Sequence, residues 1–399
     1  MFTLDYKQRS FRSYNRGSEK SMKRALIITT VSGFVPQFEM NNVKILQDLG
    51  YEVHYATNYH MPVYTDNNER LEGTGIIQHQ IDFVRSPYNI GKNIKALNQL
   101  VSLMREIKFH LVHCHTPMGG VLGRVAAHKT NTKPVIYTAH GFHFYKGALV
   151  WNWLFFYPVE RFLAHWTDCL ITINQEDYYR AKTFRVRNMV EYIAGVGIDL
   201  KKYKQDTLEK KKKRQEIGIP DDAFLLMSTG ELNKNKNHQV IINTLFQLKN
   251  KNIHYIICGT GKLKNQLVRI SKKMDMEEQI HFLDFRNDIN ELLNASDCFV
   301  FPSKREGLGV AALEAIASGL PVIAFRNRGT LEYVKDGKNG FLCKKNNTKE
   351  WSKKIILVKN ISSYKRRKIE KYNKQLIRKF GKENNIYNMK KIYRKLEGN

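Results

Sequence analysis

The chain has 399 residues, of which 66 are Lys or Arg and 37 are Asp or Glu, giving a formal net charge of +29. This balance excludes an acidic, self-solvating chain and points to an anionic partner or surface. Hydrophobic residues make up 42% of the chain and aromatic residues 11%, which excludes intrinsic disorder for most of it. The length fits about two to three domains.

The cysteines and the apolar runs narrow the class of protein further. Five cysteines stand far apart with no C-x-x-C pair, so we expect reduced thiols in a cytosolic protein. The most lipid-like stretch, residues 150–166, is interrupted by Pro158 and Glu160 and falls short of the roughly 18 apolar residues that cross a bilayer. Residues 1–22 are polar, basic and aromatic, and we expect a leader there, either a disordered arm or a segment upstream of a start at Met22.

Strands and helices are predicted to alternate along both halves of the chain. In the first half, apolar alternation predicts strands at 25–31, 51–57, 76–84, 110–116, 134–141, 169–174 and 189–198, with helices at 37–49, at 94–107 and from 119. In the second half the strands are 223–230, 254–261, 280–285, 298–303 and 320–325, with helices at 238–248, from 262, from 289 and at 310–318. This alternation favours right-handed βαβ crossovers and mainly parallel sheets.

The charged stretch 199–219 separates the two series and is expected to be a linker with a short helix. The predicted organisation is therefore a leader (1–22), an N-terminal domain (23–198), the linker, a C-terminal domain (220–375) and a last helix (376–399) that crosses back to the first domain. Ligands of open α/β sheets bind outside the carboxyl ends of the strands, so we expect the functional site in the cleft between the domains.

The C-terminal segment is strongly basic. From Lys344 onward there are 19 Lys or Arg and 4 Asp or Glu. Such runs are usually solvated helical faces. Apolar residues from Ile386 to Leu396 still recur at helical spacing, so we expect the last helix to pack against the protein rather than to form a loose tail.

The most specific motif is REGLGVAALEAIASGLPVIAF, which begins at Arg305. Glu306 follows a strand, Gly307 and Gly309 permit a tight turn, and the next helix carries Glu314. Free backbone N–H groups and the helix dipole favour a phosphate at such a turn, and the two glutamates could accept hydrogen bonds from sugar hydroxyls. A lone Gly-x-Gly, by contrast, is more often a simple turn beside surface glutamates.

The segment EGLGVAALEAIASGLPVIA, followed by GTLEYVKDGKNGFL, resembles the signature of the retaining, nucleotide-sugar-dependent glycosyltransferases of family 4. The resemblance runs from about Lys23 to Tyr393 and includes YTAHGFHFYKG, AGVGIDLKKY, GELNKNKNH and CGTGKL. It implies an α/β protein of the GT-B fold, with two Rossmann-like domains whose parallel sheets face a central cleft. It also implies a similarity to bacterial capsular and exopolysaccharide glycosyltransferases.

The resemblance assigns the cation of the donor site. It places Lys236, in the loop after Gly230, where the family holds the donor diphosphate with a Lys. Glu231 stands where the family has an Arg, and a carboxylate facing a diphosphate would repel it. We therefore expect Glu231 to point elsewhere, with Lys236, the amides near Gly307 and Lys234 providing the positive charge.

The resemblance also assigns catalytic and binding residues. Lys236, Glu306 and His140 are expected to be catalytic, with His140 contacting the donor sugar. The expected donor-binding residues are Gly33, Gly230, Gly259, Gly261, Phe285, Arg286, Gly307, Leu308, Gly309 and Glu314. Phe285 and Arg286 occupy the stretch where family members hold the base through backbone groups, which favours uracil.

No metal or cofactor is expected. His113 and His115 alternate with Cys114 on a predicted strand, but no third ligand at matching spacing accompanies them, so packing is the better interpretation. The family resemblance implies a metal-independent enzyme in which Lys and backbone amides neutralise the leaving diphosphate.

The segment from Lys146 to Trp166 is dense in aromatic residues, and two interpretations are equally favoured. It could be a core helix with Leu154, Phe155, Val159 and Phe162 facing the sheet. It could instead be an amphipathic surface that inserts into a lipid interface beside acidic headgroups. Both can be partly true.

The predicted function is retaining transfer of a hexose or N-acetylhexosamine from a UDP-sugar to a saccharide on a polyprenyl diphosphate, in capsule or exopolysaccharide synthesis. The expected location is cytoplasmic, peripherally bound to the anionic inner face of the cell membrane. Two alternatives remain. A GT-B sugar-nucleotide epimerase fits the EGLGVAALE pattern poorly. A nucleic-acid-binding protein would explain the charge, but the tail lacks an RNA-binding signature, and we expect no nucleic-acid partner.

Overall fold

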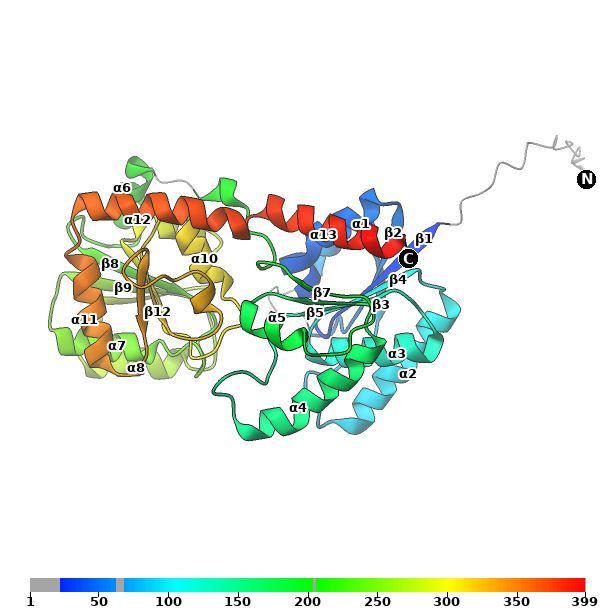
Figure 1. Cartoon of the computed structure of the whole chain (residues 1–399). Helices are drawn as coiled ribbons and strands as arrows, with labels where there is room; N and C mark the ends of the chain where they lie inside the picture. Colours follow the sequence, from blue (N-terminus) through cyan, green and yellow to red (C-terminus); the bar gives the residue numbers. More distant parts are fainter. Residues whose placement is uncertain (1–21, 62–67, 204–205, 399) are drawn as a thin grey trace, which may run out of the picture.

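The computed structural model describes residues 22–61, 68–203 and 206–398. The predicted leader lies outside these residues except for Met22. Two α/β domains lie side by side, and a long C-terminal helical segment runs along both (Figure 1). The predicted GT-B class, with two parallel sheets, is confirmed.

The N-terminal domain contains a parallel sheet in the order β3-β2-β1-β4-β5-β6-β7. The strands are β1 (Lys23–Ile28), β2 (Tyr51–Thr57), β3 (Ile77–Gln80), β4 (Leu111–Cys114), β5 (Val135–Ala139), β6 (Cys169–Thr172) and β7 (Met189–Tyr192). The helices are a π-helical turn (Val35–Glu39), α1 (Met40–Asp48), α2 (Ile90–Glu106), α3 (Pro117–Thr130), α4 (Val150–Leu163) and α5 (Gln175–Ala181), with 3-10 turns at Glu69–Leu71 and Ala164–Trp166. Apolar strand residues face helices on both sides, which is why these strands read as continuous apolar runs.

The C-terminal domain contains a second parallel sheet in the order β10-β9-β8-β11-β12-β13. Its strands are β8 (Phe224–Thr229), β9 (Ile253–Cys258), β10 (Ile280–Asp284), β11 (Cys298–Phe301), β12 (Val322–Phe325) and β13 (Gly340–Cys343). Its helices are α6 (Thr207–Glu216), α7 (Gln239–Leu248), α8 (Lys264–Lys273), α9 (Ile289–Ala295), α10 (Val310–Ala317), α11 (Thr348–Lys359) and α12 (Ser363–Leu376), with 3-10 turns at Leu200–Lys202, Thr330–Glu332 and Ile377–Phe380. In both sheets the order reverses direction at the first strand, β1 or β8, and this switch point is where such sheets bind ligands.

Helix α13 (Lys382–Glu397) packs on the N-terminal domain although it follows the C-terminal one (Figure 1). The chain crosses where the Ile198 N–H donates to the Phe380 carbonyl and the Lys382 N–H donates to the Ile198 carbonyl, both at 2.9 Å. Buried α13 side chains, Tyr393 among them, then join the cluster formed by β1 and α1. The predicted last helix, 376–399, is thus divided between the end of α12, a 3-10 turn and α13.

The predicted linker is not an isolated connector. Its helix, α6, packs against α9 and buries Arg214, whose Nη2 lies 2.5 Å from Oδ2 of Asp297. This buried pair anchors α6 to the C-terminal domain. The sequence did not predict α5, whose residues QEDYYRA carry no apolar period, or β13, whose short GFLC run directly follows a polar glycine turn.

The side chains of α4 that face the core are not the ones that the core-helix interpretation of the sequence placed there. Trp153, Phe156 and Tyr157 pack on the core of the N-terminal domain. Leu154 and Phe155 are instead exposed, together with Val159 and Phe162, so these four do not face the sheet. Because the core-facing and exposed residues are both apolar, the charge pattern of the sequence could not distinguish the two faces.

Candidate active site

Two glycine loops form the base of the candidate donor site at the carboxyl ends of β8 and β9. Gly230 and Gly259 both have φ of +144°. A Cβ on Gly259 would lie 2.1 Å from the Gly230 carbonyl oxygen, and a Cβ on Gly261 would lie 2.6 Å from the Leu232 backbone. Only glycine allows these two loops to touch, so the three predicted glycines are brought together.

Lys236 and Glu306 meet across two loops of the C-terminal domain. Nζ of Lys236 lies 2.7 Å from Oε1 of Glu306, and its aliphatic stem crosses Gly230. Asn235 ties the two loops together, because its side chain donates to the Arg305 carbonyl and accepts from the Arg305 N–H. Two residues 70 positions apart are thereby held as a preformed ion pair at the edge where the sheet binds ligands.

The glycine turn before α10 presses against the first domain. A Cβ on Gly307 would lie 2.0 Å from the His140 carbonyl oxygen, and Gly309 has φ of +90° against the Phe301 ring. The Asn174 side-chain amide donates to the Gly307 carbonyl at 3.1 Å. Leu308 is buried in the core, so this residue has only its backbone to offer a ligand.

Glu314 faces a residue that the sequence did not single out. The Tyr203 hydroxyl donates to Oε1 of Glu314 at 2.9 Å, and burial raises the pKa of this carboxyl above its ordinary value. Tyr203 follows the domain crossing at Ile198, so the carboxylate expected to bind ribose also contacts the connection between the domains. A tyrosine within a lysine-rich stretch gave no signal for this role.

Phe285 and Arg286 lie beside the glycine loops, but only one of the two side chains is free to contact a ligand. Phe285 is exposed, and the neighbouring Asp284 carbonyl accepts a hydrogen bond from the Gly259 N–H. The Arg286 guanidinium is occupied by Asp288 and by Glu216 of α6. Any contact from this stretch to a base therefore falls to its backbone and to the Phe285 ring.

His140 follows β5 directly and, itself half-buried, forms a cluster with buried Glu39 and His115. Its Nε2 lies 3.2 Å from Nδ1 of His115 and 3.7 Å from Oε1 of Glu39, and that Glu39 oxygen lies 3.5 Å from His115. Burial lowers the pKa of His140 to about 4, holds the pKa of His115 well below its ordinary value, and raises the pKa of Glu39 to about 8. Both imidazoles are therefore neutral near pH 7.

The same cluster contains three potential metal ligands. Ligand atoms of Glu39, His115 and His140 all lie within 4.8 Å of one another and could hold a metal ion. His113 takes no part, because it bonds to Tyr393 and Thr138. The sequence gave no third ligand near His113 and His115, since Glu39 reaches the cluster from the π-helical turn after β1, distant in sequence.

The remaining residues singled out from the sequence lie in loops and differ in exposure. Gly33 is buried in the loop after β1, and the following Phe34 ring packs edge-on to His140 with centroids 4.9 Å apart. Glu231 and Lys234 are both exposed.

Arg328 was missed by the sequence analysis and joins the two domains. Its Nη1 lies 2.6 Å from Oδ1 of Asp177, its Nη2 donates to the Phe142 carbonyl at 2.6 Å, and its guanidinium lies 4.7 Å from the centre of the Tyr145 ring. Glu332 adds a second link by accepting from the Gln175 N–H. An arginine after β12 has no local sequence signal, because its partners lie in the other domain.

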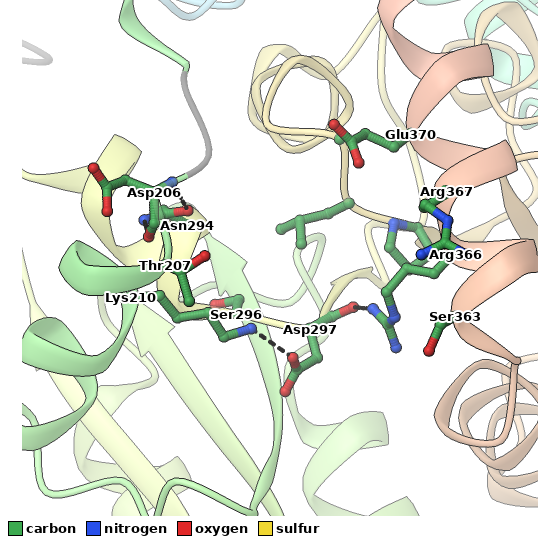
Figure 2. Close-up of a pocket in the computed structure, with 13 residues that line it drawn as sticks. Asp206, Thr207, Lys210, Asn294, Ser296, Asp297, Ser363, Arg366, Arg367 and Glu370 are labelled. Carbon is green, nitrogen blue, oxygen red and sulfur yellow. Dashed lines mark hydrogen bonds and ion pairs between the residues drawn. The ribbon is translucent and has the colours of Figure 1, made fainter.

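A polar pocket lies at the opposite edge of the C-terminal sheet (Figure 2). It is lined by α6, α9, α12 and the loops before β11 and β12. Lys210 contacts the Asp297 carboxylate at 2.8 Å, and Arg366 donates to the Asp297 carbonyl at 3.0 Å. No predicted site residue lines this pocket, so the carboxyl-edge loops remain the candidate active site.

The fold and these loops define the class: two Rossmann-like domains with a glycine turn, a Lys–Glu pair and a histidine between them are the architecture of GT-B glycosyltransferases. Residues 25–174 match the family model for "Glycosyl transferase 4-like" domains, and residues 209–376 match "Glycosyl transferases group 1". The chain belongs to the family 4 glycosyltransferases of the GT-B fold.

Relatives agree with this membership. The chain is 37% identical to the Bacillus subtilis protein named "Putative glycosyltransferase EpsD", over 84% of this chain and 86% of that protein. It is 31% identical to the Escherichia coli UDP-Gal:alpha-D-GlcNAc-diphosphoundecaprenol alpha-1,3-galactosyltransferase, over 67% and 70% respectively. The crystal structure of Anabaena HepE with UDP and glucose superposes with a TM-score of 0.76 at 20% identity, covering 94% of this chain and all of that one.

Proposed function

We propose that this glycosyltransferase moves a hexose or N-acetylhexosamine, with retention of configuration, from a UDP-sugar to a saccharide on a polyprenyl diphosphate. The observation that carries the proposal is the ion pair between Lys236 and Glu306 at 2.7 Å, next to the glycine turn that touches His140. A cation, a carboxylate, free amides and a neutral imidazole are the groups that a sugar diphosphate needs on its two sides. The 31% identical Escherichia coli relative, whose name states a UDP-Gal donor and a diphosphoundecaprenol acceptor, supports this substrate class.

In the proposed mechanism the protein supplies charge and placement. Lys236 and the backbone amides at Gly307 to Gly309 stabilise negative charge as the diphosphate leaves, without a metal ion. Glu306 orients both Lys236 and the sugar, and the diphosphate oxygen takes the proton of the acceptor hydroxyl on the same face. Neutral His140 donates or accepts a hydrogen bond at the sugar, because its lowered pKa keeps it uncharged.

The proposed location is the cytoplasmic face of the cell membrane. Among the described residues, no helix combines the length and apolarity needed to cross a bilayer. Exposed Trp151 and Phe155 on α4, next to further exposed apolar side chains of that helix, form a surface that can insert at the headgroup level. The net charge of +29 adds attraction to acidic lipids.

The test is a thermal-shift screen with UDP-Glc, UDP-Gal and their N-acetyl forms, followed by transfer to a lipid-linked acceptor and assignment of the product anomer. One donor at about 100 times its Kd should stabilise the chain by about 2.7 kcal/mol, and the product linkage should keep the donor configuration. Absence of UDP-sugar binding, together with salt-sensitive retention on RNA, would favour the nucleic-acid-binding alternative.

A further inference from the structure

An apolar groove lies on the N-terminal domain between α2, α3 and α4, which are neighbours along one side of the domain (Figure 1). It has a volume of about 530 Å³. Its walls include Ile94 of α2, Val121 and Leu122 of α3, and Phe155 and Val159 of α4. This volume lies within the range of about 300–1,000 Å³ that encloses a small organic ligand, so the groove can enclose part of a hydrocarbon chain.

The interior of the groove offers little to a polar ligand. Glu160 is the one charged side chain among the described residues that line it, and its carboxylate is occupied by Arg124 at 2.8 Å and by the Tyr137 hydroxyl at 3.3 Å. The Arg124 guanidinium also stacks over the Tyr137 ring at 4.0 Å. Because the carboxylate is already paired, Asn93, whose Oδ1 is buried without a partner, is the main polar group left in the interior, and binding there comes mostly from burial of apolar surface.

One end of the groove is different because it adjoins the candidate active site. Gly141, Phe142 and His143 line it there. The Phe142 carbonyl accepts from Arg328, and a Cβ on Gly141 would lie 3.2 Å from the Gly307 Cα.

An exposed cation lies near this inner end. Arg305 stands two residues before Gly307, which abuts Gly141, whereas the Arg328 guanidinium is neutralised by its ion pair with Asp177 at 2.6 Å. The charges of Arg305 and Arg328 both contribute, after burial, to lowering the pKa of His143 to about 4. The groove is therefore apolar along its length, and the Arg305 cation lies near the end that meets the catalytic loops.

We infer that this groove holds the first isoprene units of the lipid-linked acceptor, with the acceptor diphosphate at the end lined by His143, beside the loop that carries Arg305. The inference rests on the proposed function and adds to it a defined lipid site. An apolar slot that ends beside a cation complements an isoprenoid diphosphate, whereas a plain hydrocarbon would leave the cation unused and a free anion would leave the slot unused. Trp151 and Leu149 near the start of α4 are exposed. They extend the apolar surface toward the bilayer, which holds the remaining isoprene units of the acceptor.

The experiment measures binding of farnesyl diphosphate, farnesol and inorganic diphosphate to the full chain by calorimetry. UDP is present at saturation so that the donor site is filled. Farnesyl diphosphate should bind most tightly, farnesol more weakly, and inorganic diphosphate weakest. Failure of the parent chain to bind UDP would contradict the proposed function, while UDP binding without farnesyl diphosphate binding would overturn the groove inference alone.

Matched variants on α4 test the position of the site. Phe155 and Val159 line the groove, whereas Leu154 and Phe162 do not, and all four are exposed, at 62%, 43%, 57% and 58%. Phe155→Asp with Val159→Asp should weaken farnesyl diphosphate binding at least tenfold and leave UDP binding unchanged. Leu154→Asp with Phe162→Asp should change neither. Equal loss in both double variants would assign the lipid to the outer face of α4 and overturn the inference.

A separate variant tests the anionic end. Arg305→Ala should weaken binding of farnesyl diphosphate about tenfold and leave farnesol binding unchanged. Equal affinities of farnesyl diphosphate and farnesol for the parent chain would show that the groove recognises hydrocarbon alone and would overturn the assignment of its inner end.

Discussion

Nη1 of Arg328 lies 2.6 Å from Oδ1 of Asp177, and this ion pair joins the two domains. Both side chains are buried, with 4% and 1% of their surfaces exposed. Burial raises the pKa of Asp177 even though Arg328 opposes the change. The pair therefore fixes a closed arrangement in which the Gly307 turn touches the His140 backbone.

Replacing Asp177 with Asn should open the domains. The change leaves Arg328 as a buried charge without a counterion, which costs about 3–5 kcal/mol, and separation of the domains exposes Arg328 to water. Small-angle scattering should show a larger radius of gyration. Glu397→Gln, which breaks the exposed pair with Lys23 at 3.1 Å, is the control and should leave the radius unchanged. An unchanged radius in Asp177→Asn would mean that other contacts hold the closed state.

Lys236→Ala should lower turnover by about 10²- to 10³-fold without unfolding the chain, because the lost charge acts mainly while the diphosphate leaves. The measurement is the steady-state rate of transfer, with circular dichroism as the folding check. Lys272→Ala, on the exposed surface of α8, is the control. Near-parental turnover in Lys236→Ala would assign the role to another cation, of which Lys234 is the first candidate.

The two glutamates of the motif should separate binding from catalysis. Glu314→Ala removes the partner of Tyr203 and the proposed ribose contact, so UDP should bind more weakly by about 1–3 kcal/mol. Glu306→Ala leaves Lys236 without its carboxylate and should reduce kcat as well. Calorimetry with UDP and initial rates distinguish the two effects. Normal UDP-sugar binding by both variants would place the donor site elsewhere.

Glu39 should make stability depend on pH. Its pKa is raised to about 8 by burial, so the stability it contributes is complete below about pH 4.5, its ordinary pKa, and is lost as the pH rises through 8. Gln cannot ionise, and each pKa unit corresponds to about 1.4 kcal/mol. In urea unfolding, the free energy of unfolding of Glu39→Gln should therefore rise by about 2–4 kcal/mol relative to that of the parent as the pH goes from 5 to 9. His115 and His140 are present in both proteins, so their contributions to the pH dependence cancel. A difference in free energy of unfolding that stays constant over this pH range would show that Glu39 is ionised throughout it.

Membrane binding should have two parts. Flotation with anionic vesicles at low salt reports both the basic residues, each worth up to about 1 kcal/mol at the surface, and the apolar side chains of α4. At high salt only the apolar part remains. Trp151→Ala with Leu154→Ala should abolish the salt-resistant fraction and spare UDP binding, because both side chains are exposed. Trp153 is unsuitable for this test since it packs on the core, and parental flotation of the double variant would exclude α4 as the insertion surface.

Fold class and most helices and strands could be predicted from the amino-acid sequence alone. Apolar patterning between turns predicted each strand of both sheets except β13, because most of these strands are buried on both faces and must be apolar along their length, although the edge strand β3 is polar and largely exposed. The glycines at 230, 259 and 307 were also predicted from sequence. Their backbones approach neighbouring loops so closely that no side chain fits. Such positions require glycine, and a glycine is visible in the sequence.

Only the tertiary structure decided which distant groups meet. Arg328 contacts Asp177, Glu39 contacts His140, and Tyr203 contacts Glu314, and each pair is far apart in the sequence. Helical periodicity also could not tell the buried from the exposed aromatic residues of α4, since both are apolar. Local sequence encodes a backbone preference and an apolar face, whereas the partner of a charge or a ring is fixed only when the two domains and α13 pack together.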